Sequence, residues 1–441
     1  MIHKLAVMCC TLFVSSICFG QMSSVEFKEF TLDNGLHVIL HKDNSTPIVA
    51  VSVLYHVGSK NEKPDKTGFA HFFEHLLFEG SANIGRGEFD KYVEKAGGTL
   101  NANTSYDRTY YYEILPSNQL ELGLWLESER MLHARVDIKG VETQRQVVKE
   151  ERRQRIDNQP YGSILQESMI RAYKEHPYKW PIIGYMEHLN AAEEADYKQF
   201  YADFYVPNNA VLSIAGDLDY ASAETYIRKY FGAIPKGMKP IHRPTVVEPP
   251  LVGITKDTIY DNIQLPAVVQ TFRIPAQGTP DFYAVSMLNT LLSRGQSSRM
   301  HKEIVDKQQS AVFAGSFELP LEDPGVTIAY GICNAGIDPN VLEENMNTEI
   351  KKVQTELITE NEFQKLRNQM ENDFVSSNAR MAGIAESLAN YHVYYGNADL
   401  INNELDRFLA VTREDIKRVA NKYYNLDNRV VLHYLPNTAK P

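Results

Sequence analysis

The sequence predicts an α/β fold (an α+β sandwich), in which two duplicated, similar domains each pack helices against a mainly antiparallel sheet. Three observations support this prediction. Strand-like stretches such as IVAVSVLYHVG and TYYYEILP alternate with helix-like stretches such as NQLELGLWLESERMLHA, and this mixed order favours a sandwich of helices on sheets. A long segment of the chain occurs twice. The length of 441 residues also exceeds that of one ordinary domain.

The repeat joins DYKQFYADFYVPNNAVLSI, residues 196–214, to DIKRVANKYYNLDNRVVLH, residues 415–433. Each copy reads as an amphipathic helix, a turn and a β-strand of Val, Leu and Ile. The two copies align without gaps, and the identical pairs include Asp196 and Asp415, Lys198 and Lys417, Tyr205 and Tyr424, Asn209 and Asn428, and Val211 and Val430. A repeat of this length indicates duplication of a whole domain.

The boundary between the domains is expected near GAIPKGMKPIHRPTVVEPP, which is rich in Pro and lacks a helical period. We therefore predict an N-terminal domain over residues 21–235, a linker over 236–251 and a C-terminal domain over 252–441.

Residues 1–20 read as a signal peptide. Lys4 precedes an apolar stretch, and the small Gly20 suits cleavage before Gln21. The alternative, a retained membrane anchor, is disfavoured because the stretch is short for a span. Only Cys333 lies outside this segment, so the mature chain has no internal disulfide, and we expect a buried structural thiol. These features predict an exported protein, in a bacterial periplasm.

The charge balance bears on the partners of the chain. The formal net charge is −11, and no strongly basic tract is present. Nucleic acid and anionic membrane surfaces are therefore excluded as main partners. No later apolar run is long enough for an integral membrane span.

The stretch GFAHFFEHLLFEGS, residues 68–81, places three ionisable groups in an apolar run. Buried ionisable groups are costly unless something compensates them. On a helix, His71 and His75 are i and i+4 and share one face, where two imidazoles can bind Zn²⁺. Glu74 lies beside the same spot and can take a proton from a water molecule. A chance pair of histidines is the alternative, but this H-x-x-E-H order is the inverzincin arrangement.

A zinc hydrolase needs a third protein ligand. ETQRQVVKEERRQR, residues 142–155, supplies Glu150 and Glu151 after two valines that are expected to pack inward. By itself this segment is a solvated charged helix, and composition does not choose between the two carboxylates.

HFFEH and VVKEER, 76 positions apart from His75 to Glu151, resemble the pitrilysin and insulin-degrading-enzyme family, which includes mitochondrial processing peptidase. GGTLNANTSYDRTYYYEILP, HPYKWPIIG, YVPNNAVLSIAGDLD and GQSSRM fit the same family. The resemblance implies a zinc metalloendopeptidase of the two-domain bacterial type that hydrolyses short or unfolded peptides in an enclosed chamber. It also implies one Zn²⁺ per chain, held by His71, His75 and Glu151, with Glu74 as the base.

The resemblance places substrate along TLNANTSYDRTYYYEI, where Asn101 and Ala102 match the edge strand beside the metal. An extended peptide could add to that edge through main-chain hydrogen bonds; the alternative is an ordinary strand. In the second half, matching LLFEGS to LLSRGQ puts Ser286, Asn289 and Thr290 at the positions of His71, Glu74 and His75. None of these is a zinc-hydrolase set, so the C-terminal domain is expected to bind peptide and close the chamber.

Two departures from the family follow. Gln144 stands where relatives often carry a Glu seven positions before the ligand. The Arg and Tyr, seven apart, that hold the substrate carbonyl in long relatives have no counterpart in residues 252–441. Because two domains make half of a chamber, we expect a homodimer or a heterodimer with a zinc-free paralogue. A non-catalytic peptide-binding or assembly subunit, and a dedicated processing peptidase for one partner, are the alternative functions.

Overall fold

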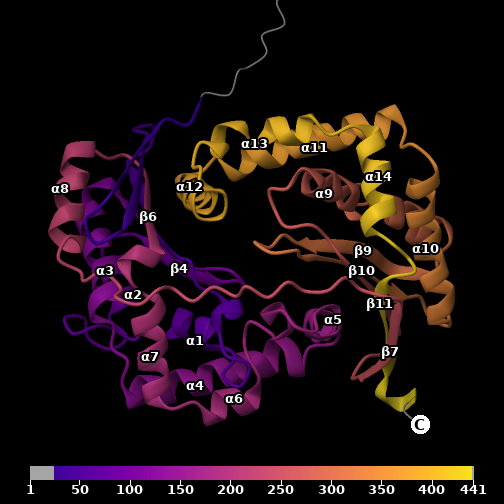
Figure 1. The fold of residues 1–441 in the computed structure, drawn as a ribbon, viewed down its shortest axis with the longest axis horizontal. Helices are drawn as coiled ribbons and strands as arrows, with labels where there is room; N and C mark the ends of the chain where they lie inside the picture. The colour runs from indigo at the N-terminus through magenta and orange to yellow at the C-terminus, as the bar shows by residue number, and fades with distance from the viewer. Residues whose placement is uncertain (1–23, 440–441) are drawn as a thin grey trace, which may run out of the picture.

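A computed structural model of the chain describes residues 24–439. The expected signal peptide and its cleavage position before Gln21 lie outside these residues. Figure 1 shows two sheets, one in each half of the chain, with helices on both faces. This arrangement confirms the predicted α/β fold built from two similar units.

The first sheet has six strands in the order β1-β2-β6-β3-β5-β4. Only β2 and β6 run parallel; the other neighbours are antiparallel. Its strands are β1 (Phe27–Thr31), β2 (His37–Lys42), β3 (Ile48–Tyr55), β4 (Thr99–Thr104), β5 (Thr109–Pro116) and β6 (Ala210–Gly216).

The second sheet has five strands in the order β7-β11-β8-β10-β9. Only β7 and β11 run parallel, so the order and directions repeat those of the first sheet without a counterpart of β1. Its strands are β7 (Ile254–Asp261), β8 (Ala267–Arg273), β9 (Ala311–Leu319), β10 (Val326–Cys333) and β11 (Arg429–Pro436).

The helices of the first half pack mainly on one face of the first sheet, where Val49, Val51 and Val53 point into the core. They are α1 (Phe69–Leu76), α2 (Phe89–Lys95), α3 (Leu120–His133), α4 (Ile138–Arg152), α5 (Ile164–Ala172), α6 (Met186–Ala191), α7 (Glu194–Phe204) and α8 (Tyr220–Phe231). Those of the second half are α9 (Pro280–Ser293), α10 (Pro339–Thr355), α11 (Glu360–Ser377), α12 (Met381–Tyr395), α13 (Leu400–Leu409) and α14 (Arg413–Tyr423).

The repeated segment forms the same structure twice. α7 and β6 in the first half match α14 and β11 in the second, starting at the aligned positions 194 and 413, and 210 and 429. Both helices begin with a capping box, in which the repeated Asp196 and Asp415 reach back to the N-cap residue. The identical residues therefore preserve a helix start as well as an apolar pattern.

One helix of each half covers the sheet of the other half (Figure 1). α12 packs on the first sheet, where Ile384 and Leu388 lie against Ala50 and Leu54. α5 packs on the second sheet, and Met169 belongs to the same cluster as several of its strand residues. Side chains alternate between the two faces of a strand, so each sheet is buried on one face by its own half and on the other by its neighbour.

A loop of the second half also docks into the first. Glu322 in this loop accepts a hydrogen bond from Lys60 at 2.6 Å and pairs with His56 at 2.7 Å. Lys60 is 3% exposed and also pairs with Asp107 at 2.9 Å. Buried charges of this kind are tolerated because each has a partner. The two halves therefore form one packed body.

Within residues 24–439 no helix combines the length and apolar character that crossing a membrane would require. Cys333 is buried at the end of β10, as expected of a structural thiol.

Candidate metal centre

Helix α1 carries the H-x-x-E-H residues, and its start is fixed in two ways. Gly68, just before the helix, has φ of 92°, and a Cβ there would lie 2.7 Å from the Ile183 carbonyl oxygen. Only glycine tolerates both conditions. The buried Glu62 carboxylate accepts the N–H groups of Gly68 and Ala70, each at 2.8 Å, and so satisfies donors that a helix start leaves free.

The apolar residues of the motif anchor the helix. Phe72 and Phe73 are fully buried, and their rings pack against Tyr197, Phe200 and Tyr205. Aromatic pairs with this spacing add to the energy of burial. The Phe residues thus hold α1 against α7 and leave His71, Glu74 and His75 on the other side of the helix.

Helix α4 lies beside α1 and brings Glu151 to the two imidazoles. Its Oε2 atom lies 3.4 Å from His71 Nε2 and 3.1 Å from His75 Nε2. The rings of His71 and His75 are inclined by 70° with centroids 4.9 Å apart. Three ligand atoms of a tetrahedral metal are separated by similar distances, because each bond is roughly 2.0–2.2 Å long.

The polar atoms of this cluster suit a metal ion. Glu151 Oε2 is buried and makes no protein hydrogen bond, which is costly unless a further group binds it. Burial would raise the pKa of the Glu151 carboxyl, but the two imidazoles hold that pKa well below its usual range. Two imidazoles and an ionised carboxylate are a donor set that Zn²⁺ takes in hydrolases.

The neighbouring Glu150 points elsewhere. Its carboxylate accepts hydrogen bonds from Arg153 at 3.1 Å and Gln154 at 3.0 Å on the exposed side of the helix. The structure thus brings Glu151, and not Glu150, to the histidines.

A cavity of about 630 Å³ opens over the cluster. His71, Glu74, His75 and Glu151 lie on one side of it. The remaining walls are residues 101–104 and Tyr106, Arg155, Ile156, Gly162, Leu165, Gln166, Pro181, Ile182 and Ile183. The Glu74 carboxylate, which is not one of the three converging ligands, therefore lines the same cavity as they do.

Asn101 and Ala102 lie on β4, which is the edge strand of the first sheet and lines this cavity. β4 pairs with β5 on one side, so its other side offers unpaired main-chain groups. The Ala102 N–H is occupied by the side chain of Asn101 at 2.8 Å. A peptide that added to this edge would displace a side chain and not another strand.

The second-half counterparts of the motif are engaged in packing. Ser286 donates a hydrogen bond to Glu318 at 2.6 Å, and Asn289 Oδ1 accepts hydrogen bonds from Ser316 and Thr327. Thr290 lies on the same buried stretch of α9. The side chains of Ser286 and Asn289 thus take part in hydrogen bonds within the second half.

Gln144 makes a hydrogen bond to the segment that follows α1. Its amide donates to Glu79 at 2.6 Å, and the same carboxylate pairs with Arg86. Glu142, two residues earlier, pairs with Arg145 at 3.1 Å. The departure from the family at position 144 therefore adds to packing between α4 and the segment after α1.

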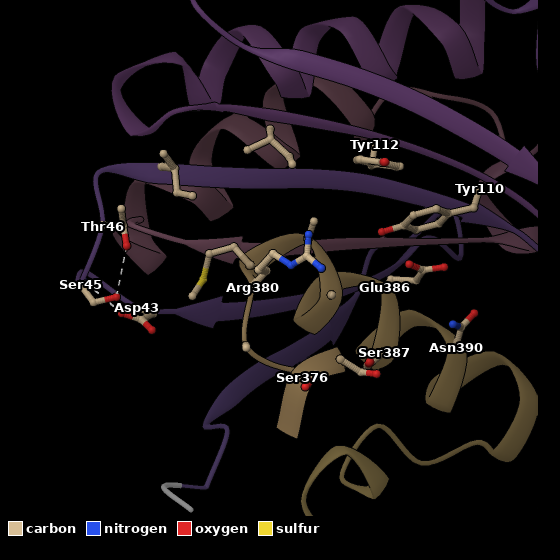
Figure 2. A pocket seen from close by; sticks show the side chains of 17 residues that line it. Asp43, Ser45, Thr46, Tyr110, Tyr112, Ser376, Arg380, Glu386, Ser387 and Asn390 are labelled. Atoms are coloured by element: carbon tan, nitrogen blue, oxygen red, sulfur yellow. Dashed lines mark hydrogen bonds between the residues drawn. The ribbon is translucent and has the colours of Figure 1, made fainter. Parts of the chain in front are cut away.

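A larger cavity of about 750 Å³ lies between β5, the β2–β3 turn and the start of α12 (Figure 2). Tyr110 and Tyr112 face it, whereas Tyr111 packs in the core beneath α1. This cavity is thus on the opposite face of the sheet from His71. Its charged residues, Asp43, Arg380 and Glu386, are of mixed sign.

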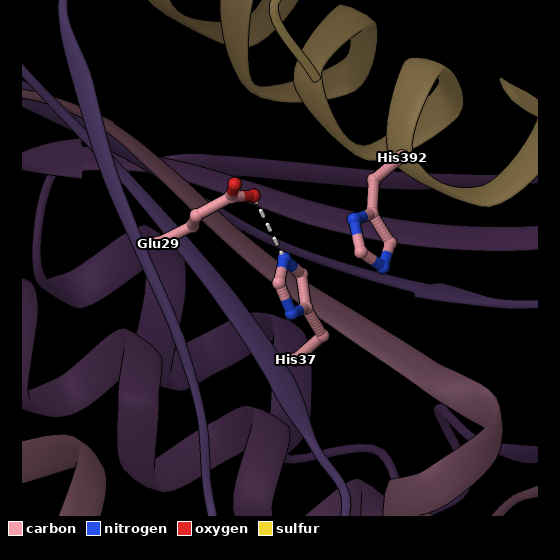
Figure 3. Close-up of side chains that lie close together, drawn as sticks. All are labelled: Glu29, His37 and His392. Atoms are coloured by element: carbon pink, nitrogen blue, oxygen red, sulfur yellow. Dashed lines mark hydrogen bonds and ion pairs between the residues drawn. The ribbon is translucent and has the colours of Figure 1, made fainter. Parts of the chain in front are cut away.

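A second His and Glu cluster joins the two halves (Figure 3). Glu29 pairs with His37 at 3.1 Å, and the His37 ring stacks on His392 with centroids 3.6 Å apart and planes inclined by 11°. The lone pairs of an imidazole lie in the ring plane, so parallel stacked rings do not point at one ion. The rings of His71 and His75 are instead inclined by 70°, and both Nε2 atoms converge on Glu151 Oε2.

Sequence reasoning missed Arg155, which lines the cavity and pairs with Glu151 Oε1 at 2.6 Å. The i, i+4 spacing of an acid and a base is a known signal. It also missed Glu62. A loop separates Glu62 from α1 in the sequence, so spacing alone does not show that its carboxylate caps this helix.

Comparison with known proteins gives consistent results. Residues 37–184 match the family described as Insulinase (Peptidase family M16), and residues 192–370 match the Peptidase M16 inactive domain. The zinc protease PqqE of Helicobacter pylori is 34% identical over 401 residues, which is 89% of each chain. An uncharacterized zinc protease of Mycobacterium leprae is 27% identical and covers 90% of this chain and 88% of its own.

Solved structures show the same fold. A protease from Helicobacter pylori matches with a TM-score of 0.89 and 31% identity, over 93% of this chain and 100% of that one. A peptidase M16 inactive domain from Pseudomonas fluorescens matches with a TM-score of 0.82 and 20% identity, over 94% and 99% of the two chains. Given these matches and the fold, the chain belongs to the M16 (insulinase, or pitrilysin-like) peptidase family.

Proposed function

We propose that this protein is a zinc-dependent endopeptidase that hydrolyses short or unfolded peptides. The observation that carries the proposal is the convergence of His71 Nε2 and His75 Nε2 on the buried Glu151 Oε2, which accepts no hydrogen bond, with Glu74 in the same cavity. His71, His75 and Glu151 would hold the metal. When bound, zinc supplies a Lewis acid that polarises the peptide carbonyl and acidifies water.

Glu74 performs the proton transfers. It is only partly buried and lies on α1 between the two histidines, within the cavity that admits water and peptide. Its carboxylate accepts the proton of the attacking water and delivers it to the leaving amine nitrogen. α1 holds the side chain in place through the cap by Glu62 and the packing of Phe72 and Phe73.

Substrate would lie along β4. Asn101 and Ala102 present an open strand edge in the cavity, and an extended peptide binds such an edge through its main chain. Recognition of main-chain groups favours unfolded segments of many sequences over folded proteins.

The decisive experiment separates binding of the metal from catalysis. Glu74→Gln should fold and keep its zinc yet lose cleavage of an unstructured peptide by roughly 10²–10⁴-fold, because a general base is lost. Metal content is measured on the same preparations. Normal turnover by this variant would rule out the assigned role, and a zinc-loaded wild type that cleaves nothing would favour the non-catalytic peptide-binding or assembly subunit.

The site of action and the partner are part of the proposal. Residues 1–20 support export, to be checked by sequencing the N-terminus of the secreted chain. All described residues that line the cavity come from the first half, so no second-half Arg or Tyr reaches the candidate site. We therefore expect a second copy or a zinc-free paralogue to complete it. Full activity from a strict monomer in solution would contradict this expectation.

A further inference from the structure

Arg155 follows the helix that carries Glu151 and lines the cavity over the His71, His75 and Glu151 cluster. It lies in a π-helical turn, η3 (Arg153–Asp157), that directly extends α4. Turns of this kind often occur at functional sites, because they change the direction of the side chains that follow. Arg155 is the one Lys or Arg among the described residues that line this cavity.

Most of the guanidinium is free to bind another group. The guanidinium forms an ion pair with Glu151 Oε1 at 2.6 Å, and the Arg155 side chain is 76% exposed. An Arg side chain offers five N–H donors in a planar fork that matches a carboxylate. One ion pair with Glu151 therefore leaves donors available in a side chain that lines the cavity.

Apart from Glu74 and Glu151, the residues that line the cavity with Arg155 carry no carboxylate. Ile156, Leu165, Ile182 and Ile183 line the cavity near it, and the acidic groups on the cavity wall are Glu74 and Glu151. Both have other tasks in the proposed function, as base and as metal ligand. An incoming carboxylate would thus be the natural additional partner of Arg155.

The segment after Arg155 is held by the second half of the chain. The Tyr161 N–H binds Asp261 at 2.9 Å, and the Tyr161 hydroxyl donates to the Leu265 carbonyl at 2.7 Å. Tyr161 has φ of 60°, an uncommon conformation for a non-glycine residue, which such contacts can maintain. The wall that bears Arg155 is therefore supported from both halves.

We propose that Arg155 is a specificity-determining residue that selects peptides with an Asp or Glu side chain close to the scissile bond. The inference rests on the proposed peptidase function. An extended peptide advances roughly 3.3 Å per residue, and Arg155 directly contacts a metal ligand, so the selected carboxylate lies within one or two residues of that bond.

The test uses pairs of unstructured peptides that differ only by Glu or Gln at one position near the cleavage site. Wild type should prefer the Glu peptide by about tenfold in kcat/KM, as expected for one charged hydrogen bond in a partly exposed setting. In Arg155→Gln this ratio should fall to about one. The ratio is internal to each preparation, so partial loss of zinc cancels.

Arg153→Gln is the matched control. Arg153 lies in the same turn but pairs with Glu150 at 3.1 Å, outside the cavity, so this variant should retain the preference. High salt should reduce the wild-type ratio, because screening weakens exposed charge pairs.

Binding separates this inference from the proposed function. Affinity of the same peptide pairs for zinc-loaded Glu74→Gln should show the same discrimination without turnover, and adding Arg155→Gln should abolish it. If wild type cleaves nothing but Glu74→Gln discriminates, the peptidase proposal fails and the selection by Arg155 stands. Equal binding of the two peptides, or a preference unchanged by Arg155→Gln, overturns the inference.

Discussion

The two halves of the chain build the same frame around different polar groups. In the first half, α1 and α4 bring His71, His75 and Glu151 together and leave Glu151 Oε2 buried without a protein hydrogen bond. In the second half, Asn289, which aligns with Glu74, is 9% exposed, and its side chain accepts hydrogen bonds from Ser316 and Thr327. The arrangement of sheet and helices is common to both halves. What differs is whether the polar side chains on it have hydrogen-bond partners within the protein or are left to bind another group.

The largest effect is expected when the Glu151 carboxylate is removed from the first half. Glu151→Gln should lower zinc occupancy at least tenfold, because neutral amide ligands bind Zn²⁺ poorly. Glu150→Gln is the matched control and should keep its zinc, since Glu150 pairs with Arg153 on the exposed side. Metal analysis of the two purified variants decides, and the reverse order would make Glu150 the ligand.

A second prediction contrasts the equivalent positions Glu74 and Asn289. Asn289→Ala should destabilise the fold by about 1–3 kcal/mol, because the hydroxyls of Ser316 and Thr327 lose a buried partner. Zinc content and peptide cleavage should remain within about threefold of wild type. Urea unfolding with an activity assay tests this. Glu74→Gln should show the opposite pattern, with activity lost and stability kept.

Glu318, which accepts the hydrogen bond from Ser286 in the second half, should make the stability of the fold depend on pH. Burial raises the pKa of its carboxyl to about 7, although the hydrogen bond from Ser286 opposes this rise. The folded state therefore holds a proton that the unfolded state releases above about pH 4.5, and stability falls as the pH rises from 4.5 through 7.

Glu318→Gln should accordingly gain stability relative to wild type at pH 8 compared with pH 5, by about 2 kcal/mol. Chemical denaturation at the two pH values measures the difference. An identical effect of the substitution at both values would show that Glu318 does not titrate in this range.

The smallest effect concerns the contact between the halves. Burial, and then the neighbouring His37, lower the pKa of His392 to about 4. The unfolded chain binds this proton first, so wild type loses stability as the pH falls from about 6.5 to 4. His392→Phe keeps an aromatic ring on His37 and should reduce the acid-induced drop in Tm by about 1–2 °C. The exposed His133 provides the control, as His133→Phe should change nothing.

Much of the fold was predictable because its signals are local. The repeat at residues 196–214 and 415–433 marks a helix and strand in each half, and the apolar period around His71 and His75 predicts α1. What sequence could not supply is the sheet on which α5 and α12 pack. Each of these helices has an apolar stripe. Such a stripe shows that a helix is buried, but it does not show which sheet the helix contacts.

The candidate site was predictable to a similar depth. Spacing alone brings His71, Glu74 and His75 to one turn of a helix. The choice between Glu150 and Glu151 needed the family resemblance, since both follow the same valines and differ only in helical phase. Arg155 and Glu62 contribute through a π turn and a loop, whose geometry depends on tertiary contacts with Asp261 and with the α1 start.

The reciprocal covering of the sheets by α5 and α12 has a consequence for dissection of the protein. Residues 232–253 contain no helix or strand, so the chain could be cut there without interrupting an element. Each fragment alone would expose a strand face rich in Val, Leu and Tyr together with one orphaned apolar helix, which favours aggregation. Produced together, the two fragments should instead assemble into a nicked protein, because each fragment supplies the helix that covers the exposed sheet face of the other. If the two fragments are expressed from separate genes, their reassembly can be coupled to growth or to a reporter, and the signal then measures the affinity of one half for the other.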